Sequence, residues 1–182
     1  NYAAQDARDI GAALQAQQGG RYRQVEVKVL ADATRDEVAD GLDWLVRNVT
    51  HRDVAMLFLA GHGVLDERGE FWYLPRDGNR DALRRTGIPN RDLTDTLDRI
   101  PGKALLFIDA CHAGAGGAGM QTRGDVDLSG LINMLSDADR GVVVYASSTG
   151  KQLSIEDSRW SNGAFTEALL EGLRGKADLT RD

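Results

Sequence analysis

The chain has 182 residues, and its 22 lysines and arginines stand against 28 aspartates and glutamates, which gives a formal net charge of −6 at pH 7. This balance argues against a nucleic-acid-binding protein, because such proteins usually present a basic face to the phosphates. The longest apolar run covers only residues 54–60, far short of the roughly 20 residues of a membrane-spanning helix. We therefore expect one globular domain over residues 1–182 that binds neither nucleic acid nor a membrane.

Helical patterns recur along the chain. Thr34 followed by Glu37 forms a capping box, a typical helix start, and Gly19 and Gly20 are a typical helix stop. Apolar residues at helical spacing predict helices over residues 2–18, 34–49, 89–100, 128–135 and 162–173.

Short apolar segments alternate with these helices. Alternating valines predict a half-buried strand at 25–29, and an aromatic segment predicts a strand or hairpin arm at 71–74, before a polar loop at 76–88. Continuous apolar runs, typical of parallel strands buried on both faces, occur at residues 54–60, 104–108 and 142–146. The alternation predicts the α/β class, an α/β/α sandwich around a mainly parallel central sheet.

In open parallel sheets, ligands bind beyond the carboxyl ends of the strands. Gly61-His62-Gly63 follows the first apolar run, and Cys111 follows the second. If these strands are neighbours, His62 and Cys111 lie about level, within reach of each other. A neighbouring histidine raises the supply of thiolate, which is the nucleophilic form of cysteine. The flanking glycines would let a substrate backbone approach and would expose N–H groups to an oxyanion.

Other interpretations of these residues stay open. Cys111 is the single cysteine, so no intramolecular disulfide forms, and an inert core thiol is the simplest alternative. His112 could join Cys111 and His62 around a metal, although no fourth ligand is spaced for zinc. His51 lies in a polar stretch and is expected at the surface.

The two motifs together resemble the caspase-like cysteine protease clan (peptidase C14), especially its bacterial metacaspase or orthocaspase type. The residues that carry the resemblance are 57–63 (LFLAGHG) and 105–114 (LLFIDACHAG), with weaker matches at 2–7, 145–148 and 163–166. The resemblance implies a caspase-like fold and a cysteine-type endopeptidase with His62 and Cys111 as its catalytic dyad. It also implies that Gly63 and Cys111 supply the oxyanion N–H groups.

Substrate specificity follows from the same resemblance. Metacaspase-type members cut after arginine or lysine, and the resemblance implies an S1 pocket formed by Asp6, Asp109 and Ser147. Two carboxylates suit a guanidinium, which offers a forked set of donors. Many clan members are activated by cleavage of a loop after the nucleophile, and Arg123 is the candidate site here. A constant intact mass in the active protein would exclude that self-cleavage.

The resemblance also sets expectations beyond the site. The family's first and last strands are expected outside residues 1–182, and flanking regulatory domains are expected in a longer chain. We expect protein or peptide substrates, a cytoplasmic location, and no metal or other cofactor. Several eukaryotic metacaspases bind calcium through an acidic cluster, but Ala118 stands where one acid would be expected.

Two other functions share these features. A catalytically silent caspase-like scaffold would recruit partners through the same fold, although both dyad residues are present here. An acyl transferase would share the acyl-enzyme step. A thiol-reactive peptide probe separates the peptidase from the scaffold, and the identity of the acyl acceptor separates the peptidase from the transferase.

Overall fold

The computed structural model describes residues 2–112, 142–147 and 162–177. The chain divides into two compact units, one formed by residues 1–31 with 154–182 and the other by residues 32–153. The predicted helix at 128–135 and the candidate cleavage site Arg123 lie outside the described residues.

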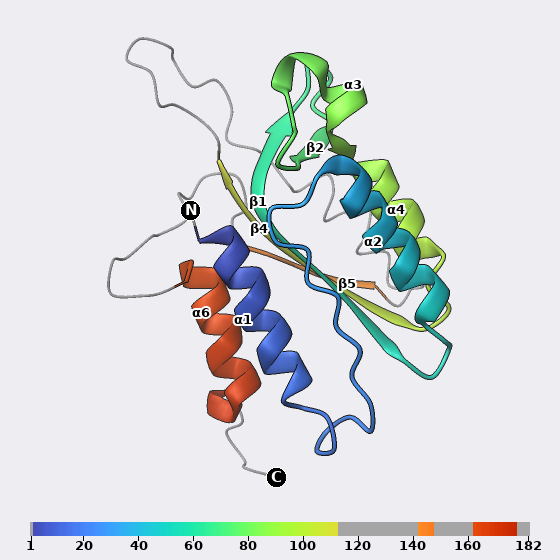
Figure 1. Ribbon diagram of the computed structural model, residues 1–182, viewed down its shortest axis with the longest axis vertical. Coiled ribbons are helices and arrows are strands. Elements are labelled where there is room, and N and C mark those ends of the chain that lie inside the picture. The colour runs from blue at the N-terminus through green and yellow to red at the C-terminus, as the bar shows by residue number, and fades with distance from the viewer. Residues whose placement is uncertain (1, 113–141, 148–161, 178–182) are drawn as a thin grey trace. The chain divides into compact units, whose positions relative to one another are not determined.

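The larger unit is built on a five-stranded sheet in the order β3-β2-β1-β4-β5 (Figure 1). The pairs β1–β4 and β4–β5 are parallel, whereas β1–β2 and β2–β3 are antiparallel. The strands are β1 (Val54–Leu65), β2 (Phe71–Leu74), β3 (Ile88–Pro89), β4 (Lys103–His112) and β5 (Val142–Ala146). The expected mixed α/β class with a parallel centre is therefore confirmed.

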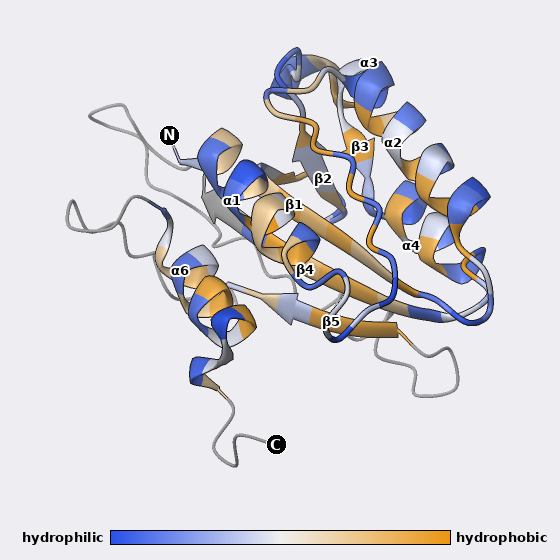
Figure 2. Ribbon diagram, turned by 60° about the horizontal axis from the view of Figure 1, so that its bottom comes forward, coloured by the Kyte–Doolittle hydropathy of each residue, from blue (hydrophilic) through white to orange (hydrophobic). Residues whose placement is uncertain are grey.

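One face of this sheet is covered by α2 (Arg35–Asn48) and α4 (Asn90–Asp98), which lie side by side in Figure 1. Figure 2 shows how strongly apolar β1 and β4 are, as the continuous runs predicted. The buried core on this face consists of Val38, Leu42, Ala55, Leu59, Phe71, Ile88, Leu93, Leu97, Ile100, Ala104, Leu106, Ile108 and Val142.

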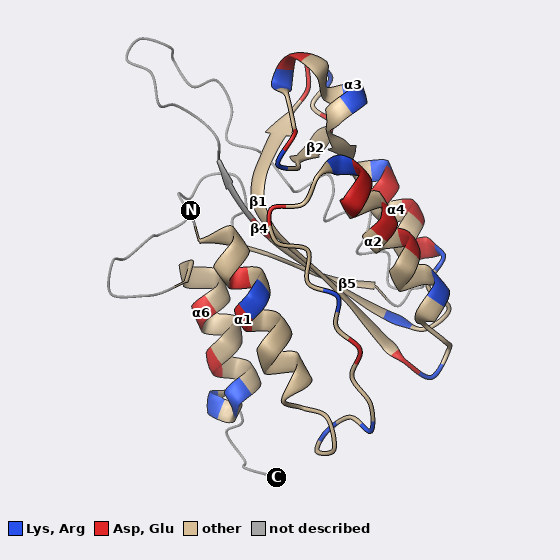
Figure 3. Ribbon diagram, in the orientation of Figure 1, with Lys and Arg blue, Asp and Glu red and all other residues tan. Residues whose placement is uncertain are grey.

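Charge on α2 and α4 is concentrated away from that core. Figure 3 shows acidic residues along both helices, and Asp36, Glu37, Asp40 and Asp43 of α2 are exposed. An apolar stripe inside and carboxylates outside make each helix amphipathic. These two helices carry seven of the 28 acidic residues of the sequence.

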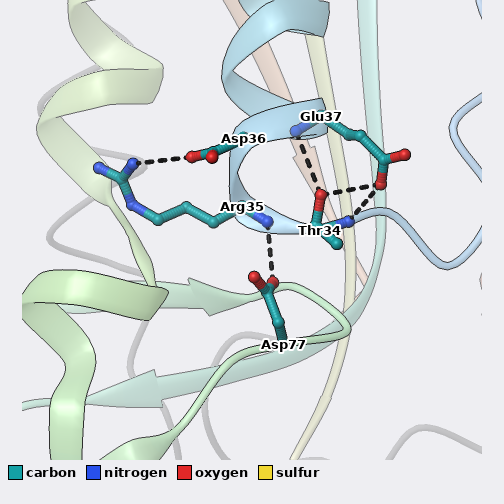
Figure 4. Close-up of polar contacts among 5 residues, drawn as sticks. All are labelled: Thr34, Arg35, Asp36, Glu37 and Asp77. Carbon is teal, nitrogen blue, oxygen red and sulfur yellow. Dashed lines mark hydrogen bonds and ion pairs between the residues drawn. The ribbon is translucent and has the colours of Figure 1, made fainter.

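The predicted capping box starts α2 (Figure 4). Thr34 Oγ1 accepts a hydrogen bond from the Glu37 N–H at 3.4 Å, and Glu37 Oε2 accepts one from the Thr34 N–H at 2.7 Å. The Arg35 N–H donates to Asp77 Oδ1 at 2.8 Å. These partners satisfy N–H groups that a helix start leaves free, and Asp77 ties the helix to the segment after β2.

The smaller unit contains α1 (Ala3–Gln15) and α6 (Ala164–Glu171), which lie side by side, and a π-helical turn at Gly172–Lys176. After α1, Gly19 has a φ of 78°, a conformation that glycine adopts without strain. A Cβ at position 11 of α1 would lie only 2.7 Å from Val29 Cγ2, and Gly11 has no Cβ. The glycine therefore lets the 25–29 segment pack against α1.

The expected strand at 25–29 is wrong, because the segment joins no ladder among the described residues. Its backbone bonds to side chains instead: the Val25 N–H donates to Gln18 Oε1 at 3.0 Å, and Val25 O accepts from Gln15 Nε2 at 3.3 Å. The alternation of valines reflects contact with α1 rather than a place in a sheet.

The polar segment 76–88, expected as a loop, contains short elements. These are a 3₁₀ turn at Arg80–Ala82, α3 (Leu83–Thr86) and the first residue of β3. Thr86 Oγ1 accepts a hydrogen bond from the Asn79 N–H at 2.9 Å and donates to Asn79 O and Ala82 O. Elements this short depend on such individual bonds, which periodicity does not reveal.

Over the described ranges, no helix has the length and apolarity needed to cross a membrane.

The turn between β1 and β2 is organised by Asp66. Its Oδ1 accepts hydrogen bonds from the N–H groups of Glu70 and Arg68, each at 2.9 Å, and its Oδ2 accepts from Trp72 Nε1 at 3.3 Å. The bond from Glu70, and then those from Arg68 and Trp72, hold the pKa of the Asp66 carboxyl below its ordinary value. The ionised carboxylate therefore fixes the turn that sets the β1–β2 register.

We predict that Asp66→Asn lowers stability at pH 7, and that the difference from wild type shrinks as the pH falls below about 4. The folded state has the lower pKa, so its contribution is present above the unfolded pKa and is lost as the pH falls through the folded value. Urea unfolding at pH 7 and pH 3 measures this difference. Glu67→Gln, an exposed change in the same turn, is the matched control. An equal loss at both pH values would contradict the account.

Candidate active site

Both motif strands continue past their apolar runs. β1 extends through Gly61-His62-Gly63 to Leu65, and β4 extends through Cys111 to His112. The expectation that these residues follow the strand ends is therefore wrong, because they belong to the last residue pairs of the β1–β4 ladder. Pairing with β4 carries the first strand to Gly63, and pairing with β2 over residues 62–65 carries it to Leu65.

The parallel register of β1 and β4 brings the two motifs level. His62 is the Cα partner of Cys111, Gly63 is that of His112, and Ala60 is that of Asp109. Neighbouring strands lie about 4.8 Å apart. The expectation that His62 and Cys111 lie level on neighbouring strands is confirmed.

The alternation of strand residues assigns His62 to one face of the sheet. Leu59 belongs to the buried core under α2 and α4, so residues at odd positions of β1 face that core. His62 therefore points to the opposite face, and its side chain is exposed. An imidazole in this position is accessible to a ligand that approaches that face.

Asp109 and Ser147 lie on the same face as His62, beside each other. Ile108 of β4 and Ala146 of β5 are Cα partners that face the core, so the residue after each points the other way. The Ser147 N–H donates to Ile108 O at 2.9 Å and prolongs this pairing. Asp109 is buried, with 6% of its surface exposed. Ser147 Oγ is buried and has no hydrogen-bond partner among the described residues.

Asp6 belongs to the other compact unit and has a partner there. It lies in the first turn of α1, is 3% exposed, and accepts a hydrogen bond at Oδ1 from the Gly163 N–H at 3.2 Å. Gly163 is the N-cap of α6, where a carboxylate is favourable to the helix dipole. The carboxylate therefore links α1 to the start of α6, and its expected place in an S1 pocket with Asp109 stays a prediction.

Two further polar residues were not singled out from the sequence. Tyr73 of β2 donates its hydroxyl to Ala60 O at 3.0 Å, and its ring lies against Gly61. Asn162 of the smaller unit is 3% exposed, and its Oδ1 has no hydrogen-bond partner in the part of the chain that the structure describes. An aromatic strand predicts burial but not the partner of one hydroxyl, so no pattern pointed to Tyr73.

Gly61 has a reason to be glycine besides substrate approach. Its φ is 153°, and a Cβ there would lie 3.0 to 3.3 Å from atoms of the Tyr73 ring and hydroxyl. The absence of a side chain thus makes room for Tyr73.

In the part of the chain that is described, no group of three or more histidine, cysteine, aspartate or glutamate side chains converges. The alternative in which His112 joins Cys111 and His62 around a metal stays a prediction. His51 is exposed in the turn before β1, where the sequence predicted it.

Comparison with known proteins agrees with the fold. The family model for the caspase domain matches residues 1–181. A crystal structure of protein GSU0716 from Geobacter sulfurreducens is similar in fold, with a TM-score of 0.59 at 20% sequence identity over 95% of this chain and 72% of that chain. A search of curated proteins found no significant match. The chain therefore belongs to the caspase domain family of cysteine peptidases, peptidase C14.

Proposed function

We propose that this domain is a cysteine endopeptidase that cleaves proteins after arginine or lysine, with Cys111 as nucleophile and His62 as base. The observation that carries the proposal is the register of β1 and β4, in which His62 is the partner of the chain's single cysteine. Membership of the caspase domain family supports a peptidase in general.

The reaction would proceed through an acyl-enzyme. The Cys111 thiolate attacks the scissile carbonyl carbon, and the tetrahedral intermediate collapses to a thioester as the amine leaves. His62, having taken the thiol proton, gives a proton to the leaving amine. Water then attacks the thioester, which releases the acid product and returns the proton to the thiol. The N–H groups of Gly63 and Cys111 are proposed to stabilise the oxyanion.

Specificity for a basic residue is proposed to come from Asp109 and Ser147, with Asp6. The support is that Asp109 and Ser147 are neighbours on the sheet face that also carries His62. A buried carboxylate attracts a guanidinium or ammonium group in a low-dielectric site. The Ser147 hydroxyl, which has no partner within residues 2–112, 142–147 and 162–177, offers one further polar contact. Cleavage after Arg123, flanking domains and a cytoplasmic location remain predictions.

We predict that the folded protein cleaves fluorogenic peptides with arginine or lysine at P1 and that Cys111→Ala and His62→Ala each lower kcat/KM by at least about 1,000-fold. The physical reason is that neither nucleophile nor base can be replaced by water at the same position. His51→Ala, at an exposed histidine, should keep full activity. Failure of the folded wild type to cleave any peptide would favour the scaffold function instead.

We predict that Asp109→Asn lowers kcat/KM for an arginine peptide on the order of 100-fold, because one partner of a buried charge pair is lost. Asp95→Asn, on the exposed side of α4, should have no effect. Cleavage of peptides with aspartate at P1 by the wild type would retain the peptidase but exclude this pocket.

A further inference from the structure

Tyr73 reaches from β2 across the strand that carries His62. Its Cα is the partner of Gly63, yet its hydroxyl donates to the carbonyl of Ala60 at 3.0 Å, three residues earlier along β1. The ring lies over Gly61 on the way, and a Cβ there would be 3.1 to 3.3 Å from ring atoms and 3.0 Å from the hydroxyl oxygen. The side chain therefore spans the segment 60–63 from one end to the other.

The main chain of β2 cannot make this contact. The β1–β2 pairing begins at His62–Leu74 and runs to Leu65–Phe71, so no β2 residue is the partner of Ala60. Pro75, which follows Leu74, has no N–H to donate. The Tyr73 hydroxyl thus provides the donor at the point where the antiparallel ladder has stopped.

The surroundings of Tyr73 keep its hydroxyl a donor. Burial, and then the negative charge of Asp32, raise the pKa of Tyr73 above its ordinary value. Asp32 is itself held in place, because its carbonyl accepts from Arg76 Nε at 2.9 Å and the neighbouring Ala33 carbonyl accepts from the Arg76 N–H at 2.8 Å. A protonated phenol can donate to a carbonyl, whereas a phenolate cannot.

The side chains of Tyr73 and His62 lie on opposite faces of the sheet. Tyr73 pairs with Gly63, at an odd position of β1, and it packs against the core under α2 and α4. His62 faces the other way. Tyr73 therefore acts on His62 only through the main chain of β1.

We propose that Tyr73 is a positioning residue for the peptidase reaction: its bond to the Ala60 carbonyl and its contact with Gly61 fix the strand segment that holds His62 opposite Cys111. The proposal rests on the proposed function, because it concerns the geometry of that dyad. Catalysis is sensitive to displacements of about 1 Å, so the loss of one anchor beside the base should be measurable as a rate.

The test is Tyr73→Phe, which removes the hydroxyl and keeps the ring over Gly61. We expect kcat for an arginine peptide to fall about tenfold, with KM unchanged, because the base is misplaced while the substrate pocket is intact. Tyr22→Phe removes a hydroxyl from an exposed tyrosine and should leave kcat at the wild-type value. A wild-type kcat in Tyr73→Phe, or an equal loss in both variants, would overturn the proposal.

A second readout does not depend on peptidase activity. The imidazole NMR signals of His62, assigned with His62→Gln, should shift or broaden in Tyr73→Phe, while those of His51 stay unchanged. The same spectra in Tyr22→Phe should match the wild type. If the wild type cleaves no peptide, the proposed function fails, and unchanged His62 signals in Tyr73→Phe would separately overturn the positioning role.

A mutant cycle tests whether the contact with Gly61 and the bond to Ala60 act together. Gly61→Ala places a Cβ against the Tyr73 ring and should displace it. The double variant with Tyr73→Phe should then lose much less kcat than the product of the two single effects, because both changes break the same contact. Fully independent effects would contradict a shared anchor.

Discussion

The parallel pairing of β1 with β4 is the interaction on which the account depends. It joins two strands that are far apart in sequence, and its register runs without interruption from Val54–Lys103 to Gly63–His112. A slip of one residue would send His62 to the core face, because strand side chains alternate. The apolar residues of both strands, buried against α2 and α4, fix this register over the length of the ladder.

The two faces of the sheet in the larger unit differ in chemical character and in role. One face is apolar and is closed by two amphipathic helices whose outer sides are acidic. The other carries His62, Asp109 and Ser147 at the carboxyl ends of three neighbouring strands, where parallel sheets usually bind ligands. Packing on the first face thus holds the polar residues of the second in fixed relation, which is the condition that a preorganised site requires.

Continuous apolar runs made β1, β4 and β5 predictable as strands. The expectation that β5 is buried on both faces is wrong, because Val143 and Tyr145 are 44% and 49% exposed. The capping box of α2 was predictable for a similar reason: its partners lie three residues apart. The strand ends were not, since Gly61 and Gly63 weaken a strand, and pairing with β4 and β2, together with the Tyr73 side chain, stabilises them. The segment 25–29 was wrongly predicted to be a strand, because its contact with α1 produces the same alternation of apolar residues as a place in a sheet. In the site, the sequence predicted that His62 and Cys111 lie level. The burial of the Ser147 hydroxyl and the bond from Tyr73 to the Ala60 carbonyl depend on tertiary contacts and were not predictable.

The juxtaposition of positions 62 and 111 can be measured directly by cross-linking. Cys111 is the chain's single cysteine, so His62→Cys creates one defined pair, and neighbouring strands about 4.8 Å apart fall within the Cα separations of about 4.4–6.8 Å that disulfides span. Under mild oxidation, intact mass should show an intramolecular disulfide in His62→Cys. Met56→Cys, on the same strand and face but the partner of Leu105, should keep both thiols. Free thiols in His62→Cys, or equal cross-linking in both variants, would contradict the register and with it the proposed dyad.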